Sequence, residues 1–286
     1  MLQTYNHIKQ FAIFYLICFT AYYVWSLWYG LTFTQIKPVF FFNQRDLTGN
    51  IVLLTKIHLY LLRSQNLRLL FDLLYILLPV LTTVLAIRQN RYQTFSAIAM
   101  IIFNIVYAFC FSIMSFVSIE VMLAFMIVPI VLLFKKPKNF FFAIEGVRIL
   151  FILFFLSTAL WKIRAGGLFN LDQMSGILLY QHNYLFLNVE PSYFKTMIAY
   201  LIEHTHISYT LYFAATLAEV LFVVGFFTKK LDRVLIALFL LFAAMNFLVM
   251  HINYFSWLPF VGSLYFAKFA LQKRLPRNGP ISVERE

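Results

Sequence analysis

The sequence predicts an all-α, polytopic membrane protein, a helical bundle of about eight transmembrane helices with interfacial helices on its outer face. Hydrophobic residues make up 62% of the 286 positions and charged residues 12%, whereas an ordinary soluble domain is about 25% charged. The apolar residues come in long runs, and about 20 consecutive apolar residues are enough for one helix to cross a bilayer. Short basic turns separate several of these runs.

We expect a single transmembrane domain over residues 1–272 and a basic tail over 273–286. The expected spans are 11–31, 69–87, two within 94–134, 141–163, 209–227, 234–250, and a short or tilted one at 260–271. The first run follows Lys9 and has no small-residue cleavage site, so it reads as a retained anchor rather than a cleavable signal.

Two segments between spans are predicted to contain helices that do not cross the membrane. Residues 50–62, in the middle of segment 32–68, are too short and too charged to span, so a surface-lying or re-entrant helix fits them better. In segment 164–208, a helix is expected after Pro191. Its apolar positions have helical spacing and are Phe194, Met197, Ile198, Leu201 and Ile202. We expect this amphipathic helix to cap a cavity below it.

The distribution of basic residues predicts the orientation. The turns 88–93, 135–138 and 229–233 and the tail are rich in Lys and Arg, which favour the cytoplasmic side. Both termini are therefore expected in the cytoplasm. The net charge of +12 is assigned to contacts with anionic lipid. Nucleic acid is not expected as a partner, because no basic face with stacking aromatics lies outside the apolar runs.

Three ionisable residues are the catalytic candidates: Lys162 and His251, each at the outer end of a predicted span, and Glu219 near the middle of another. Ionisable groups within a membrane are costly and are often functional. A lysine shielded from water can act as a base, and a histidine can relay a proton. The alternatives are a lysine reaching the headgroups, an interfacial histidine, and a glutamate that hydrogen-bonds between helices. We expect all three to meet on one face.

Glu145 and Arg148 are three residues apart, which places them on one helix face as a neutralising pair. The sequence has no glycine-rich phosphate loop, no HExxH and no CxxC, so neither a nucleotide nor a metal site is expected.

Three blocks of sequence resemble the HTTM superfamily of vitamin K-dependent γ-carboxylase-like membrane proteins. They are STALWKIRAGGLFNLDQMSG (157–176), AEVLFVVGFFTKKLDR (218–233) and FAAMNFLVMHINYF (242–255). The resemblance implies a quinone or hydroquinone cofactor, with Lys162 as the base that deprotonates the hydroquinone. Trp161 and Asn246 lie in the same blocks and are the candidates for binding it. The family's histidine before Met-Asn falls on Ala243 here, and the nearest histidine is His251.

The leading hypothesis is a quinol-dependent membrane enzyme or maturation factor with an outward-facing cavity between helices 141–163, 209–227 and 234–250. Small bacterial members of the superfamily resemble a protein that helps mature Sdp-type peptide toxins. The resemblance therefore implies a bacterial inner membrane as the location and an exported peptide or a molecule in the lipid phase as the substrate. The alternative is a non-enzymatic membrane subunit that binds or escorts a partner protein. A transporter is less favoured, since no inverted repeat or pair of broken helices is visible. A cavity that reaches Lys162 would favour the enzyme.

Overall fold

The computed structural model describes residues 2–37, 47–115, 119–187 and 192–270, and all regular elements within these ranges are helices. Within them, six helical segments are long and apolar enough to cross a membrane. These are α1 (Leu2–Trp28), α4 (Gln65–Ile87), α5 (Gln93–Ser115), α7 (Pro137–Arg164), α11 with α12 (Thr205–Leu221, Val224–Phe227), and α13 with the π-helical η4 (Asp232–Met245, Asn246–Met250). The all-α prediction is confirmed.

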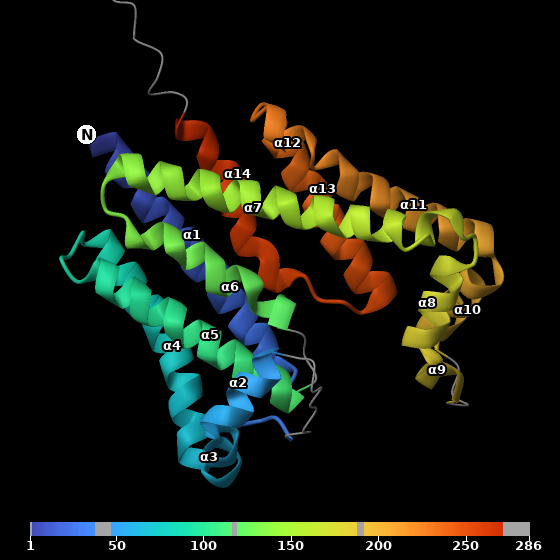
Figure 1. The fold of residues 1–286 in the computed structure, drawn as a ribbon, viewed down its shortest axis with the longest axis horizontal. Helices are drawn as coiled ribbons and strands as arrows, with labels where there is room; N and C mark the ends of the chain where they lie inside the picture. The colour runs from blue at the N-terminus through green and yellow to red at the C-terminus, as the bar shows by residue number, and fades with distance from the viewer. Residues whose placement is uncertain (1, 38–46, 116–118, 188–191, 271–286) are drawn as a thin grey trace, which may run out of the picture.

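Two shorter apolar stretches, Ile119–Leu133 and Phe255–Ala267, lie where the other two spans were expected. The remaining elements are α2 (Leu47–Thr55), α3 (Ile57–Arg63), η1 (Ile119–Met122), α6 (Leu123–Ile127), η2 (Val128–Leu133), η3 (Gly167–Phe169), α8 (Gln173–Gln181), α9 (Asn183–Leu187), α10 (Tyr193–Glu203), η5 (Phe255–Trp257), α14 (Leu258–Ala267) and η6 (Lys268–Ala270). Figure 1 shows other helices of the bundle on both sides of α7.

The second half of segment 94–134 differs from the full-length span that the sequence predicts. It is divided into η1, α6 and η2, and Pro129 lies at the start of η2. Proline has no N–H for an α-helical hydrogen bond, and its ring clashes with the preceding turn. Two spans within 94–134 require a turn, which the sequence predicts near Ser115–Ser118, and this stretch lies largely outside the described residues.

The segment between α1 and α4 contains α2 and α3, which are both short, as expected. They are separated at Lys56, whose backbone is left-handed (φ 55°). The loop after α1 is held by Asp72 of α4, whose carboxylate accepts hydrogen bonds from the Phe33 and Thr34 backbone N–H groups at 3.1 and 2.9 Å. The Tyr107 hydroxyl also donates to Asp72 at 3.1 Å. This buried carboxylate has several donors and serves to fix the fold.

Helix α7 is the central element of the bundle. It packs against α14, η2 and α1 on one side and against α11 and α12 on the other. The core along it is aromatic: the rings of Phe155 and Phe222 stack with centroids 4.1 Å apart, and Phe151 stacks on Phe260 at 5.0 Å. Such contacts add stability beyond burial of apolar area.

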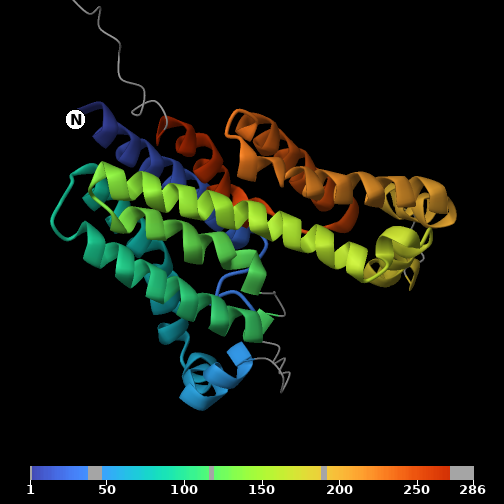
Figure 2. The same ribbon diagram turned by 45° about the horizontal axis from the view of Figure 1, so that its top comes forward.

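The short basic turns lie at one end of the bundle. The turns after α4, η2 and α12 lie on the same side as the N-terminal end of α1, whereas α2–α3 and α8–α10 lie at the other ends of the long helices (Figures 1 and 2). The grouping of the basic turns used in the orientation argument therefore holds in the fold.

Candidate functional site

Lys162 lies in the last turn of α7. The chain reverses direction at Gly166, which has a left-handed backbone (φ 75°) that favours glycine. At Gly167, a Cβ atom would lie 2.7 Å from the Tyr212 hydroxyl of α11. The neighbouring Leu168 carbonyl accepts a 2.7 Å hydrogen bond from the Tyr209 hydroxyl. These contacts fold the segment after α7 back against α11, beside the lysine.

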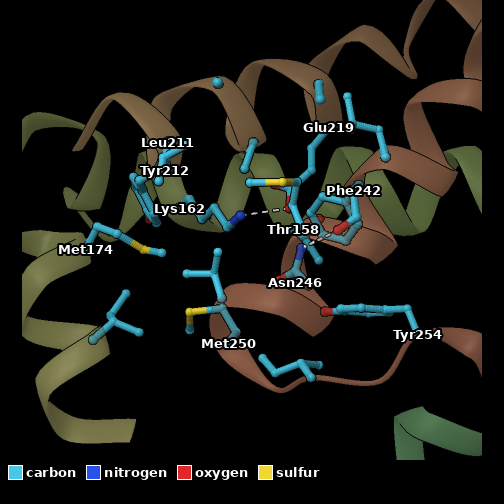
Figure 3. A pocket seen from close by; sticks show the side chains of 18 of the residues that line it. Thr158, Lys162, Met174, Leu211, Tyr212, Glu219, Phe242, Asn246, Met250 and Tyr254 are labelled. Atoms are coloured by element: carbon cyan, nitrogen blue, oxygen red, sulfur yellow. Dashed lines mark hydrogen bonds and ion pairs between the residues drawn. The ribbon is translucent and has the colours of Figure 1, made fainter. Parts of the chain in front are cut away.

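Lys162 forms an ion pair with Glu219. Its Nζ atom donates to Glu219 Oε1 at 2.7 Å, from α7 to α11 (Figure 3). The glutamate side chain is 3% exposed and the lysine side chain 26%. Lys162 Nζ also lies 5.4 Å from the centre of the Tyr212 ring. A charged pair within an apolar bundle is costly unless its partners are well placed, so two of the three predicted catalytic residues meet at a site with defined geometry.

The second oxygen of Glu219 differs from the first. Oε2 is buried and has no hydrogen-bond donor among the described residues. Thr158 lies close to the carboxylate (Figure 3), but its hydroxyl donates to the Phe155 carbonyl at 2.8 Å. Buried polar atoms in proteins nearly always have partners. Glu219 Oε2 can therefore accept a hydrogen bond from a bound molecule.

A pocket of about 380 Å³ adjoins this pair. Its lining is mostly apolar and comes from α7, α8, α11, α13 and η4, which contribute Met174, Ile177, Leu211, Leu241, Met245 and Val249 among others. The polar groups at its wall are Thr158, Lys162, Tyr212, Glu219, Asn246 and Tyr254. Burial raises the pKa of the Tyr254 hydroxyl to about 12, so it is a neutral donor. A few polar groups within apolar walls are typical of small-molecule sites.

The amphipathic helix expected after Pro191 is present as α10, capped by Ser192 Oγ, which accepts from the Lys195 N–H at 3.1 Å. Its buried residues Ile198 and Leu201 belong to a second apolar cluster with Met174 and Leu178 of α8. The expectation that this helix caps the cavity directly needs correction, since no α10 residue lines the pocket. Helix α8 forms that wall, and α10 packs against α8.

His251 lies outside the pocket lining, although Met250 and Ile252 on either side belong to it. Its ring stacks on Phe194 of α10 with centroids 4.1 Å apart and lies 5.4 Å from the His182 ring. Burial, followed by the nearby His182, lowers the pKa of His251 from its ordinary value of 6.5. The structure thus does not bring His251 to the Lys162–Glu219 pair.

Of the two candidates for cofactor binding, Asn246 and Trp161, only the first lines the pocket. Asn246 lines the pocket, and its Nδ2 donates to the Phe242 carbonyl at 2.8 Å. Trp161 is 66% exposed and does not belong to the lining. Adjacent helical residues point in directions about 100° apart, which explains why Lys162 faces the pocket and Trp161 does not.

Sequence reasoning missed several polar residues of the pocket. Thr158 precedes Lys162 by four positions, and Tyr212 precedes Glu219 by seven, so helical periodicity places each pair on one face. That signal was present in the sequence. Helical periodicity could not have indicated Tyr254, because this residue lies in a non-helical connection after η4.

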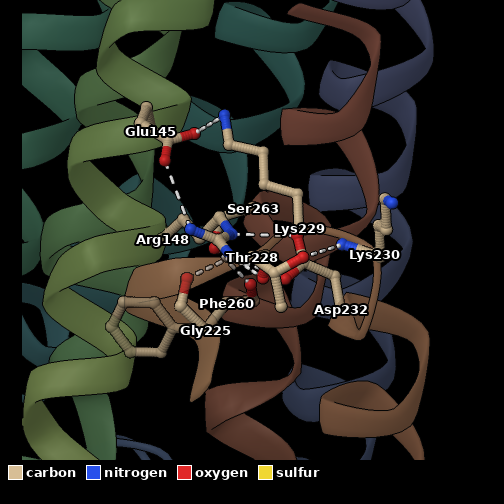
Figure 4. Close-up of polar contacts among 9 residues, drawn as sticks. All are labelled: Glu145, Arg148, Gly225, Thr228, Lys229, Lys230, Asp232, Phe260 and Ser263. Atoms are coloured by element: carbon tan, nitrogen blue, oxygen red, sulfur yellow. Dashed lines mark hydrogen bonds and ion pairs between the residues drawn. The ribbon is translucent and has the colours of Figure 1, made fainter. Parts of the chain in front are cut away.

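A second charged cluster lies toward the other end of α7 (Figure 4). The predicted Glu145–Arg148 pair is confirmed at 3.2 Å. The sequence did not reveal that Arg148 also binds Asp232 of α13, with Nε and Nη2 donating to Oδ2 and Oδ1 at 2.9 and 2.6 Å. Glu145 in turn pairs with Lys229.

Among the described residues, no group of three or more His, Cys, Asp or Glu side chains is placed to hold a metal ion. The site therefore consists of an ion pair, its orphan carboxylate oxygen and an apolar pocket. No family model, curated protein or solved structure matches the chain.

Proposed function

We propose that this integral membrane protein binds a lipid-soluble molecule with a hydroxyl headgroup, and that the Lys162–Glu219 pair takes up the hydroxyl proton. One observation carries the proposal: a 2.7 Å ion pair whose second carboxylate oxygen is buried without a donor beside an apolar pocket of about 380 Å³. The apolar walls suit a molecule that arrives through the bilayer. The polar groups suit a headgroup that can donate a hydrogen bond.

The resemblance to the HTTM superfamily narrows the proposed molecule to a hydroquinone. One hydroxyl would donate to Glu219 Oε2, with its ring between the apolar walls and Asn246 beside it. The pair would act as one base: Lys162, in its neutral form, would be the final proton acceptor, and Glu219 would connect its Nζ, which donates to Oε1 at 2.7 Å, to the hydroxyl held at Oε2. A hydroquinone, when bound, would supply the acidic hydroxyl.

In this proposal the protein is a quinol-dependent enzyme or maturation factor of a bacterial inner membrane that acts on an exported peptide or a lipid-phase substrate. Both termini would be cytoplasmic, and the pocket would face outward because it lies away from the basic turns. A cysteine at Lys136, on the basic side, should resist an impermeant thiol reagent in intact cells. A cysteine at the exposed Asn183 should label, and the reverse pattern would contradict this orientation.

The test uses the protein in phosphatidylcholine nanodiscs and menadiol, a naphthohydroquinone. A hydroquinone anion absorbs at longer wavelength than the neutral molecule, so deprotonation of bound menadiol is visible as a red shift. The wild type should bind menadiol and produce the shift. Lys162→Arg should fold and bind but give no shift, because arginine does not release its proton in this range.

A matched pair of variants tests the pocket itself. Ala215 lines the pocket, whereas Leu217, on the same helix, is exposed outside it. Ala215→Phe should abolish menadiol binding, and Leu217→Phe should leave it unchanged. If Lys162→Arg keeps the full spectral shift, Lys162 is an interfacial anchor. The alternative, a non-enzymatic subunit that escorts a partner, would then replace the enzyme.

A further inference from the structure

The charged cluster around Arg148 borders a second pocket, of about 670 Å³, which is independent of the proposed function. It lies between α7, the turn that joins α12 to α13, and α14, at the end of the bundle where the basic turns gather (Figures 1 and 4). The Lys162 pocket shares no lining residue with it.

Arg148 fixes the wall of this pocket. Its side chain is 2% exposed, and its Nη2 atom donates to the carbonyls of Gly225 and Thr228 at 2.7 and 3.3 Å as well as to Asp232. At Gly225 of α12 a Cβ atom would lie 2.6 Å from Ile152 Cδ1, so the absence of a side chain lets α12 approach α7 this closely. One buried guanidinium therefore holds the backbone of the turn that carries the basic residues.

The charges of the pocket do not balance. Five cationic and two acidic side chains line it, which leaves an excess of three positive charges. The acids Glu145 and Asp232 pair with Arg148 and Lys229. Within the described part of the chain, the other three cations, Lys230, Arg233 and Lys268, have no carboxylate within ion-pair distance.

The uncharged part of the lining is mostly apolar. Phe226, Phe227, Ile236 and Leu264 contribute to it, together with Tyr265, whose ring centre lies 3.8 Å from Lys268 Nζ. Asp232 is the first residue of the membrane-length segment Asp232–Met250. The cations thus lie where a membrane helix begins, beside a hydrophobic surface, as a ligand with both a charged head and an acyl chain requires.

We propose that this pocket binds an anionic phospholipid, with the phosphate held by Lys230, Arg233 and Lys268 and the upper part of an acyl chain against Phe226 and Ile236. A free phosphate would satisfy the cations alone and would leave the apolar surface without a role. Arg148 acts as a positioning residue, because its own donors are already engaged by the protein.

The test is lipid retention, measured by native mass spectrometry after detergent-solubilised protein is mixed with equal amounts of phosphatidylglycerol and phosphatidylcholine. The wild type should retain phosphatidylglycerol preferentially, and the preference should fall as salt rises. The variant K230Q/R233Q/K268Q should bind phosphatidylglycerol on the order of ten-fold more weakly.

The control variant R88Q/K136Q/K138Q removes the same charge from three exposed cations on the other basic turns. It should keep the wild-type preference, and equal losses in both triple variants would overturn the proposal in favour of unspecific surface attraction. A separate measurement tests whether the wild type binds inorganic phosphate. A wild type that binds phosphate yet shows no preference between the two lipids would also overturn it. If the first variant does not fold, the wild-type preference decides, because a wild type that retains both lipids equally at low salt overturns the proposal.

Discussion

Helix α7 forms two ion pairs with later helices, one at Arg148, nearer its N-terminal end, and one at Lys162 in its last turn. The two pairs differ in whether all their polar atoms have partners. At Arg148 all three guanidinium nitrogens donate to protein oxygens, and both Asp232 oxygens accept. At Lys162 one carboxylate oxygen of the partner, Glu219 Oε2, has no donor and lies beside a pocket. Saturated pairs fix a fold, whereas an unsatisfied buried group calls for another explanation.

The exposed fractions of the side chains also differ between the two ion pairs. The Arg148 and Asp232 side chains are 2% and 5% exposed, whereas Lys162 is 26% exposed above a nearly buried Glu219. Removal of one partner should therefore affect stability strongly at the Arg148 end and ligand binding at the Lys162 end. The predictions below test this division.

The largest effect is expected for Arg148→Leu. It leaves Asp232 buried without its partner and frees the carbonyls of Gly225 and Thr228, and the loss of one member of a buried pair typically costs about 3–5 kcal/mol. The midpoint temperature of thermal unfolding, measured on the detergent-solubilised protein, should fall strongly. Arg164→Leu, an exposed arginine at the end of the same helix, is the control and should shift it little.

The double variant R148L/D232L sharpens this test. Replacing both charges by apolar side chains is often near neutral, so the double variant should recover part of the stability that Arg148→Leu loses. A double variant less stable than the single one would mean that the arginine acts mainly through the turn carbonyls.

A smaller effect on stability, but a loss of binding, is expected for Glu219→Gln. The amide keeps the shape of the side chain and an oxygen acceptor for Lys162, so the free energy of unfolding should fall by about 1–2 kcal/mol at most. Menadiol binding should weaken by about ten-fold or more, because a charged acceptor is replaced by a neutral one. Isothermal titration calorimetry in nanodiscs measures this. Glu203→Gln, on the exposed Glu203, should bind like the wild type, and equal binding by Glu219→Gln would count against the proposed site.

The sequence was sufficient for the six long helices and for part of the site. Hydropathy located the six long segments because the bilayer sets their length. The expectation that Lys162 and Glu219 meet agrees with their 2.7 Å ion pair, whereas His251 lies apart from it. The Arg148–Asp232 pair joins residues 84 positions apart, and nothing local in a sequence encodes such a contact.

His251 shows why another part of the site was not predictable. An uninterrupted α-helix was assumed as far as Met250, but its last residues, Asn246–Met250, form a π-helix, and His251 is left-handed with φ 53°. A π turn and a left-handed residue both change the direction of the side chain relative to an α-helix. The ring consequently lies on Phe194 and not at the pair.

The smallest predicted effect concerns pH at this histidine. Because the pKa of His251 is lowered in the folded state from about 6.5, the unfolded chain binds more protons just below that pH, and stability must fall as the solution is acidified through it. His251 lies beside His182, whose Nε2 donates to the Val249 carbonyl in the wall of the pocket at 3.0 Å. A charge on His251 would therefore act on this contact. Thermal unfolding followed from neutral pH downward should lose part of its acid sensitivity in His251→Gln, whereas His206→Gln, on an exposed histidine, should follow the wild type. A His251→Gln profile identical to that of the wild type would show that this ring does not couple protons to the fold.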